Sequence, residues 1–260
     1  MSVWKHKYLI SALVKRDIIG RYHGSTMGLL WSLFNPIIML SIYTFVFSVV
    51  FKARWGTGTG SKTEFALMLF AGLILFNLFA ECISRAPTII LANTNYVKKV
   101  VFPLELLPIV SLGTALFHFT VSLCVWLAAY TVFFGIPHLQ VLAVPLILIP
   151  LILFILGISW FISSIGVFLR DVSQVIGVVV SIMMFLSPIF YPISALPEQY
   201  RAYLNLNPLT GAIELTRGIL FNGDIPAASQ LLPYYISALL ACYLGFAWFQ
   251  MTRKGFADVL

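Results

Sequence analysis

The sequence predicts an all-α integral membrane protein with six transmembrane helices, folded as one domain over residues 1–260. Hydrophobic residues make up 60% of the chain, charged residues make up 10%, and the mean hydropathy is +0.98. A soluble domain has about a quarter of its residues charged. Two long runs, Met27–Phe51 and Leu106–Leu169, contain no Asp, Glu, Lys or Arg. A membrane β-barrel would instead show alternating segments of about ten residues.

The chain begins with a basic segment that we expect to be a cytoplasmic interfacial helix within residues 1–26. On a helix, one side of this segment would carry Trp4, Tyr8, Ala12, Ile19 and Tyr22. Aromatic side chains on a basic helix are typical of a helix lying at the lipid headgroups. The apolar residues Ile10, Leu13 and Val14 lie on the opposite side, so the amphipathic pattern is moderate. The alternative is a positively charged flank with no further role.

The six spans are predicted at about 27–51, 65–84, 105–134, 140–168, 173–191 and 229–251. At about 1.5 Å per residue, the first run is long enough to cross a hydrocarbon core of roughly 30 Å with some tilt. The uncharged run Leu106–Leu169 is too long for one span, and Gly135 to His138 fits a hairpin between two. The second span ends in polar residues, Glu81 and Arg85.

Basic residues indicate that both termini lie in the cytoplasm. With this topology, eleven basic residues lie on the cytoplasmic side: Lys5, Lys7, Lys15, Arg16, Arg21, Arg85, Lys98, Lys99, Arg170, Arg253 and Lys254. Five lie on the external side: Lys52, Arg54, Lys62, Arg201 and Arg217. Cytoplasmic segments of membrane proteins are enriched in Lys and Arg. The net charge of +7 therefore reflects topology and does not indicate a nucleic-acid partner. The three cysteines, at positions 82, 124 and 242, lie in apolar segments and read as packing residues.

Two segments between spans are long enough to be structured. In the inner one, 86–103, Asn93 or Asn95 fits the cap of a short amphipathic helix that carries Tyr96, Val97, Lys98 and Lys99. Such a helix suits docking into a partner's groove, and a basic loop that only sets topology is the alternative.

The outer segment, 192–228, is too apolar for a free loop. We expect a short helix over 209–221 after Pro208, dipping into the outer half of the membrane as a re-entrant segment. Glu214 and Arg217 lie three residues apart on this helix and can form an ion pair.

Two short motifs flank the fifth span. Arg170 and Asp171 precede it, and we expect a local ion pair that ends one helix and caps the next, with a gating contact as the alternative. Ser187 and Pro188 begin the sequence SPIFYP, whose two prolines should end the helix. SPIFYP can be interpreted as a kinked helix end that only faces lipid. The functional alternative is that it forms a gate at the pore exit.

No constellation for catalysis or metal binding stands out, so we expect a protein that is not an enzyme. His6, His23, His118 and His138 are scattered along the chain, and acidic residues are few. The loop GTGTGSKT at 56–63 is similar to a phosphate-binding loop, but Ser61 separates Gly60 from Lys62 and no strand precedes it. We therefore expect no nucleotide, metal or other cofactor in this chain.

Several blocks, taken together, are similar to a known family. They are Arg16-Asp17, Arg21-Tyr22, Ser25, Gly28, Leu30-Trp31 and Pro36, then Tyr96 to Lys99 with Phe102-Pro103, then Phe168 with Arg170-Asp171, then Ser187 to Ile189 with Tyr191-Pro192, and last Asn207-Pro208 with Arg217-Gly218. In this order and spacing the chain resembles the permease subunits of polysaccharide-exporting ABC transporters. The resemblance is closest to permeases for O-antigen, capsule and teichoic acid.

The resemblance implies a homodimer in a bacterial inner membrane, bound to two copies of a cytoplasmic ATPase that would carry ATP and Mg²⁺. Its substrate would be a lipid-linked glycan in contact with membrane lipids. The implied coupling residues are Asn93, Asn95, Tyr96, Val97, Lys98 and Lys99. The implied gate and interface residues are Arg16, Asp17, Arg21, Tyr22, Arg170, Asp171, Ser187, Pro188, Glu214 and Arg217.

A pore for such a substrate must contact sugar rings without binding one particular sugar sequence tightly. The faces of aromatic side chains suit that task. The candidates that we single out for the channel are Trp31, Phe34, Tyr43, Phe185 and Tyr191. Most aromatic rings of a membrane protein face lipid or core, which is the competing interpretation. Three other functions remain open at this point: a permease for a drug or small lipid, a membrane-embedded glycosyl or acyl transferase, and a structural scaffold for an assembly.

Overall fold

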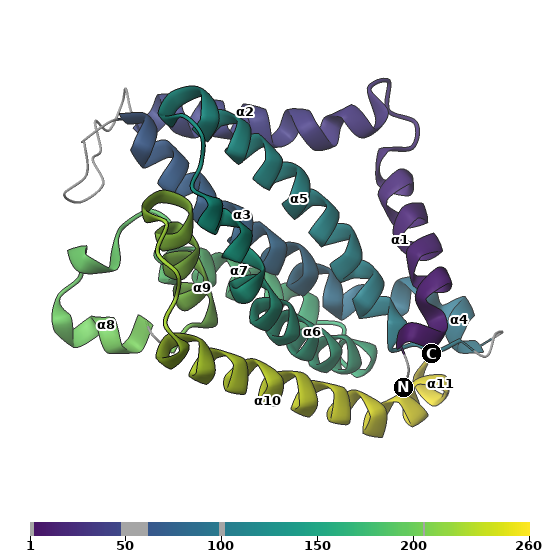
Figure 1. The fold of residues 1–260 in the computed structure, drawn as a ribbon. Helices are drawn as coiled ribbons and strands as arrows, with labels where there is room; N and C mark the ends of the chain where they lie inside the picture. Colours follow the sequence, from purple (N-terminus) through teal and green to yellow (C-terminus); the bar gives the residue numbers. More distant parts are fainter. Residues whose placement is uncertain (1–2, 48–61, 99–101, 205) are drawn as a thin grey trace.

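The computed structural model describes residues 3–47, 62–98, 102–204 and 206–260, and within these ranges the chain is helical without β-strands (Figure 1). The long helices are α2 (Trp31–Phe45), α3 (Lys62–Arg85), α5 (Leu106–Phe134), α6 (Val144–Phe168), α7 (Val172–Leu186) and α10 (Ala228–Thr252). Short turns of 3₁₀ or π helix are η1 (Val3–His6), η2 (Gly28–Leu30), η4 (Ala86–Thr88), η5 (Leu91–Asn93), η6 (Leu139–Ala143), η7 (Ile193–Ala195), η8 (Gly218–Asn222) and η9 (Arg253–Gly255).

Five helical segments are long and apolar enough to cross a membrane. They are Gly28–Phe45, Thr63–Thr88, Leu106–Phe134, Leu139–Phe168 and Ala228–Val259. They match the first four predicted spans and the last one, although the predicted end of the first span and the loop at 56–61 lie outside the described residues. Gly135 ends α5 with a φ of 90°, where a side chain would be strained, so the predicted hairpin is confirmed.

The prediction for the fifth span was wrong in its length. Helix α7 ends at Leu186 rather than near 191, and its 15 residues extend only about 22 Å. The cause is local: Ser187 adopts an extended backbone, φ −93° and ψ 147°, as residues before a proline prefer. The chain then turns into the segment that leads to α8 (Glu198–Leu204) and α9 (Pro208–Arg217).

Helix α3 is the centre of the bundle. It packs against α2, α5, α6, α7 and α9, and most of its side chains belong to the main hydrophobic core. The indole of Trp126 on α5 donates a hydrogen bond to the carbonyl of Leu67 on α3, at 2.9 Å. A helix that is apolar on all sides is expected to be buried, and this one is.

Helices α6 and α10 pack with their backbones in direct contact. A Cβ atom added to Gly157 would lie 2.3 Å from the carbonyl oxygen of Ala241, and one added to Gly245 would lie 1.9 Å from the carbonyl oxygen of Gly157. Small residues that let helices approach are typical of contacts between membrane helices. Farther along, Ser164 and Thr252 join the same two helices by a hydroxyl hydrogen bond of 2.6 Å.

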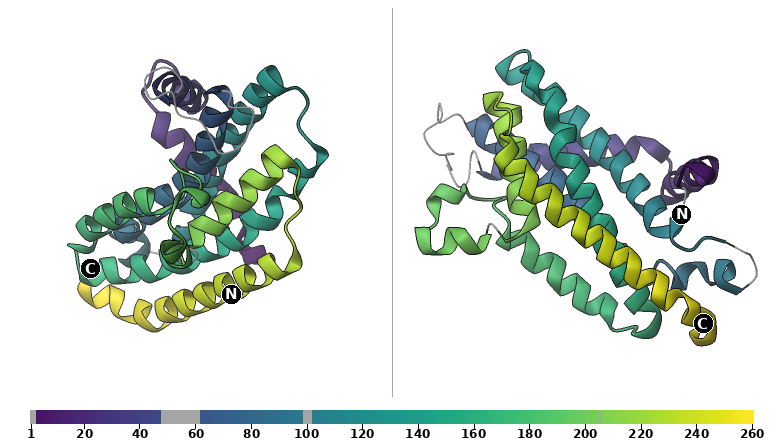
Figure 2. Two further views of the ribbon diagram at one scale, coloured as in Figure 1. Left: turned by 90° about the vertical axis from the view of Figure 1, so that its left-hand side faces the viewer. Right: turned by 60° about the horizontal axis from the view of Figure 1, so that its bottom comes forward.

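The elements outside the bundle gather at its two ends. Both termini lie at one end, together with α1 (Lys7–Tyr22), α4 (Thr94–Lys98) and α11 (Phe256–Val259), and α8 and α9 lie at the other (Figure 1). Helices α2 and α10 form opposite edges of the bundle (Figure 2). Pro36 is the buried residue of α2, and none is buried on α7, so both helices expose apolar side chains.

Helix α1 confirms a helix in the predicted N-terminal segment and shows which side of it is covered. Leu13 is buried, and Val14 packs so closely on α5 that a Cβ atom added to Gly113 would lie 2.6 Å from it. On the opposite side, Tyr8 is 80% exposed and Ile19 is 44% exposed. The apolar side with Leu13 and Val14, which makes the amphipathic pattern of the sequence only moderate, is therefore the side that packs on the bundle.

Candidate functional site

Two clusters of polar side chains lie at opposite ends of α3. The α1 cluster consists of Asp17, Arg21, Tyr22, Glu81, Arg85, Thr114 and His118. The α9 cluster consists of the side chains of Ser187, Asn207, Glu214 and Arg217 with the backbone carbonyls of Pro188 and Ile189, and Arg217 also contacts the carbonyl of Met68 on α3. Predicted gate residues occur in both clusters, so the structure brings together side chains far apart in the sequence.

Asp17 holds the middle of α1 against α3 and α5. Its two carboxylate oxygens accept hydrogen bonds from both terminal nitrogens of Arg85, at 2.8 and 2.9 Å, and Thr114 donates a third at 2.8 Å. Burial by itself would raise the pKa of Asp17, but the bonds from Arg85 and Thr114 outweigh it and the pKa is lowered below 3.8. Asp17 is therefore ionised at neutral pH, and its bidentate pair has a fixed geometry.

A second set of contacts secures the end of α1. Arg21 forms an ion pair with Glu81 at 2.6 Å, and the Nδ1 atom of His118 lies 3.0 Å from the same carboxylate. The hydroxyl of Tyr22 lies 3.1 Å from the other ring nitrogen of His118. A proton on Nδ1 would let His118 donate to Glu81 and accept from Tyr22. His118 on α5 thus links the end of α1 to α3, a contact that its position in the sequence did not predict.

Helix α1 also contacts the predicted coupling segment. Arg16 donates a hydrogen bond to the hydroxyl of Tyr96 at 3.0 Å, and the Tyr96 ring stacks on Phe102 with a centroid separation of 4.4 Å. The predicted short helix is present as α4, which begins at Thr94. Asn93 directly precedes α4, and its side-chain nitrogen donates to the carbonyl of Ile89 at 2.8 Å, whereas Asn95, the other predicted cap, lies inside the helix.

The remaining coupling candidates lie in or beside α4. Asn95 is exposed, and Val97 and Lys98 continue the helical backbone. Lys99 and the two valines after it lie outside the described residues. Among the coupling candidates whose side chains the structure describes, Asn93, Asn95 and Tyr96, Asn95 is the exposed one.

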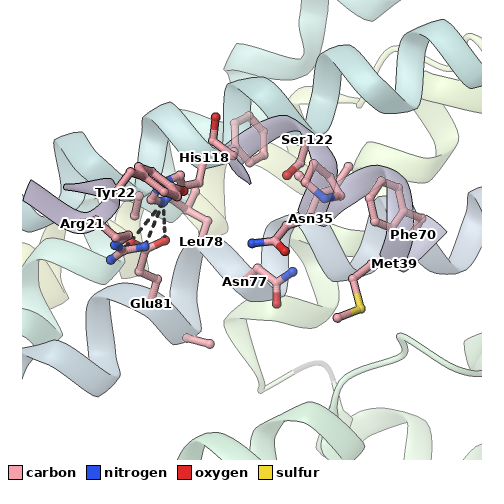
Figure 3. A pocket seen from close by; sticks show the side chains of 16 residues that line it. Arg21, Tyr22, Asn35, Met39, Phe70, Asn77, Leu78, Glu81, His118 and Ser122 are labelled. Carbon is pink, nitrogen blue, oxygen red and sulfur yellow. Dashed lines mark hydrogen bonds and ion pairs between the residues drawn. The ribbon is translucent and has the colours of Figure 1, made fainter. Parts of the chain in front are cut away.

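A cavity of about 400 Å³ adjoins the α1 cluster (Figure 3). Helices α1, α2, α3 and α5 form its wall. Arg21, Glu81 and His118 lie at one end, and Asn35, Asn77 and Ser122 line the rest. Phe70 and Phe119 contribute apolar surface. The cavity therefore joins an ion-paired end to a neutral polar region.

In the α9 cluster, Arg217 joins three parts of the chain. Its guanidinium donates to the carbonyl of Met68 on α3 at 2.8 Å, to the carbonyl of Pro188, and to the carbonyl of Ile189 at 2.9 Å. It also forms the predicted ion pair with Glu214, at 3.2 Å. Arg217 is 5% exposed, and a Cβ atom added to Gly72 would lie 2.8 Å from its Nη2 atom. A side chain at position 72 would therefore require the Arg217 guanidinium to shift.

Asn207 completes the α9 cluster. Its side-chain oxygen accepts from the backbone N–H of Leu209, which caps α9 as the sequence Asn207-Pro208 favours. Its side-chain nitrogen donates to the hydroxyl of Ser187 at 3.0 Å. The predicted helix over 209–221 is confirmed as α9 followed by the π turn η8. Ser187 and Pro188 are thus tied to the segment that follows them.

The predicted ion pair between Arg170 and Asp171 was wrong. Both side chains are exposed, and the described structure contains no salt bridge between them. Asp171 does precede α7, but its φ of −69° and ψ of −14° are helical, and its side chain accepts no capping hydrogen bond. A capping side chain requires an extended backbone at that position.

The five aromatic channel candidates fall into two separate groups. Trp31 and Phe34 lie exposed on α2, each 38% exposed, whereas Tyr43 packs partly against the core. Phe185 is 64% exposed near the end of α7, and the hydroxyl of Tyr191 donates to its carbonyl at 3.1 Å. Phe190 contacts both Phe185 and Phe47, which lies one turn after Tyr43, so the end of the first group approaches the second.

Several residues of these clusters were not singled out from the sequence. Glu81 and Arg85 were noted only as the polar end of a span, and Thr114, His118, Asn35, Asn77 and Asn207 were given no site. The signal for His118 and Asn77 was a strongly polar side chain inside an apolar span. Such residues in membrane segments usually face a protein interior or a water-filled cavity.

Comparison with known proteins adds an independent line of evidence. The family model described as ABC-2 type transporter matches residues 8–221. An O-antigen export system permease protein RfbA of Klebsiella pneumoniae is 28% identical over 253 residues, which cover 97% of this chain and 95% of that protein. The RfbA protein of Myxococcus xanthus is 24% identical, with 99% and 97% covered. The polysialic acid transport protein KpsM of Escherichia coli is 27% identical, with 95% and 94% covered.

Proposed function

The chain belongs to the ABC-2 type transporter family, and we propose that it is the permease subunit of an exporter that moves a lipid-linked polysaccharide out of the cytoplasm. The observation that carries this proposal is the end-to-end similarity to export permeases, 97% of this chain against 95% of the Klebsiella protein. The apolar helices supply the membrane-spanning body that such a function needs.

The proposed assembly is a homodimer in the bacterial inner membrane with two copies of a separate ATPase subunit. Both termini would lie in the cytoplasm, with α7 as a sixth, shorter span and α8 and α9 as an external re-entrant segment. The common location of the two termini, α1 and α4 at one end of the bundle supports this orientation (Figure 1). ATP and Mg²⁺ would bind the partner, which would supply the energy for transport.

The contacts of the two clusters support a mechanical role for α3. A partner that presses on α4 would move Tyr96, and through Arg16 it would pull on α1. Asp17 ties α1 to Arg85 near one end of α3, and Met68 near the other end binds Arg217 of α9. Coupling between distant sites travels through packed rigid elements with two arrangements. We propose that α3 carries movement from the cytoplasmic side to the external gate.

The test is deletion of the gene in its host, followed by localisation of the long-chain surface glycan. We expect the glycan to leave the surface and to accumulate inside, lipid-linked and full length. Complementation with the wild-type gene controls for effects on neighbouring genes. Normal surface glycan in the deletion strain would contradict polysaccharide export and favour a permease for a drug or small lipid.

A further inference from the structure

The described part of α3 contains one polar side chain that breaks its buried run. Every residue from Phe65 to Phe79 is buried except Asn77, which is exposed. A polar side chain that only faced lipid at this depth would be costly. Asn77 instead opens into the cavity beside the α1 cluster (Figure 3). Its exposure therefore marks a polar part of the cavity wall.

Side chains from two other helices meet Asn77 in this space. Asn35 of α2 lies beside Asn77 with its amide directed into the cavity, and Ser122 of α5 lines the same region (Figure 3). Among the hydrogen bonds of the described residues, none involves the side chain of Asn35, Asn77 or Ser122. The donors and acceptors of these side chains are exposed to the cavity and are not used within the chain, so they can bind a polar occupant.

The charges in the cavity select the chemistry of that occupant. Arg21 is already paired with Glu81 at 2.6 Å, and His118 contacts the same carboxylate. A phosphate would meet the Glu81 carboxylate and gain no unpaired cation from the described lining. Amides and a hydroxyl each offer both donors and acceptors, which matches the hydroxyl groups of a neutral sugar. The volume of about 400 Å³ also falls in the usual range for small-molecule sites.

We propose that this cavity binds a neutral sugar unit of the exported glycan through Asn35, Asn77 and Ser122. The inference rests on the proposed function and names one contact surface of that substrate. The ion-paired end formed by Arg21, Glu81 and His118 positions α1 beside the sugar and does not hold the phosphate of the lipid carrier.

The first experiment compares export in a host that carries Asn77→Leu or Asn35→Leu with export in the wild type. Leucine fills a similar volume without hydrogen-bonding groups and suits an apolar helix. We expect surface glycan to fall about fivefold, the effect of one lost hydrogen bond to a ligand, with unchanged permease in the membrane. Thr120→Leu is the matched control, since Thr120 is exposed on α5, bonds to its own helix and does not line the cavity.

The outcomes separate this inference from the proposed function. Full export in both asparagine variants would overturn the sugar site, while loss of surface glycan in the deletion strain would still support export. If the deletion strain kept its glycan, the proposed function itself would fail.

A second measurement excludes indirect effects of the substitutions. The photoreactive residue p-azidophenylalanine is placed at position 77, or at position 120 as control, in exporting cells, and the cross-linked permease is stained for glycan. Glycan attached at 77 and not at 120 supports the proposal. A cross-linked pair of permease chains without glycan would overturn it, because a second copy would then cover these amides.

Discussion

The guanidinium of Arg217 donates a hydrogen bond to the carbonyl oxygen of Met68 at 2.8 Å, across 149 positions of sequence. The same side chain holds the carbonyls of Pro188 and Ile189, just after α7 ends. One buried arginine thus fixes the re-entrant candidate segment to the central helix. Gly72 lies beside this guanidinium, so a side chain at that position would displace it.

Replacing Arg217 should disrupt the external end of the bundle. Arg217→Leu would leave buried carbonyls without donors, at a cost of about 1–3 kcal/mol each. We expect the melting temperature of the purified protein to fall by roughly 5 °C or more, together with loss of surface glycan. Glu214→Gln is the matched control, since it removes only the partly exposed ion pair and should have a small effect. Equal melting temperatures for both variants would contradict this role.

The bond between Asp17 and Arg85 predicts a defined response to pH. Because the pKa of Asp17 is lowered on folding, its stabilisation is present above 3.8 and is lost as pH falls through the folded value. The wild-type melting temperature should therefore fall below about pH 4 as Asp17 is protonated. Asp17→Asn should melt lower at pH 7 and show a smaller acid-induced fall. If Asp17→Asn showed the same acid-induced fall in melting temperature as the wild type, that fall would have to come from other carboxylates.

The contact between α6 and α10 predicts that their glycines tolerate no side chain. Gly157→Ala would place its Cβ against the backbone of Ala241, so we expect little folded protein in the membrane. Gly177→Ala on α7 is the matched control, because nothing lies within 4 Å of its added Cβ. Quantitative immunoblotting of membrane fractions measures both. Equal amounts of the two variants would show that α6 and α10 can separate at little cost.

The exposed aromatic candidates predict an effect on transport without an effect on folding. Trp31→Ala removes a side chain that is 38% exposed and lies outside the core, so the protein should remain folded and bound to its ATPase. We expect lower export because a surface for sugar rings is lost. Tyr191→Ala should act in the same way, although it also removes a bond to the carbonyl of Phe185. Normal surface glycan in both variants would exclude these rings from the channel.

The exposed position of Asn95 on α4 predicts a contact with the ATPase. Asn95→Glu would add a carboxylate at the proposed docking surface, and we expect export to fall while substrate-stimulated ATP hydrolysis loses its coupling to transport. Tyr96→Phe is a milder companion, since it removes the bond from Arg16 and keeps the stacking on Phe102. Unchanged substrate-stimulated ATPase activity and export in Asn95→Glu would argue against a coupling role for α4.

The sequence by itself determined the helical membrane class, the approximate positions of five predicted spans and a helix break within the sequence SPIFYP, but it placed the end of α7 near 191 instead of at Leu186. These features depend on local composition: apolar runs such as 106–134 and the conformational limits around Pro188. Local rules also predicted the pair of Glu214 with Arg217, because three residues on a helix bring the side chains together.

Only the tertiary structure decided which polar residues meet. Asp17 pairs with Arg85 and Thr114, and His118 joins Glu81 and Tyr22, because α1 folds back onto two helices distant in sequence. The predicted ion pair between Arg170 and Asp171 makes the same point. The two residues are adjacent in sequence, but their side chains do not pair in the structure. A charged residue inside an apolar span indicates from the sequence alone that a partner is needed, because an unpaired charge is costly there. Which residue becomes that partner depends on how whole helices pack.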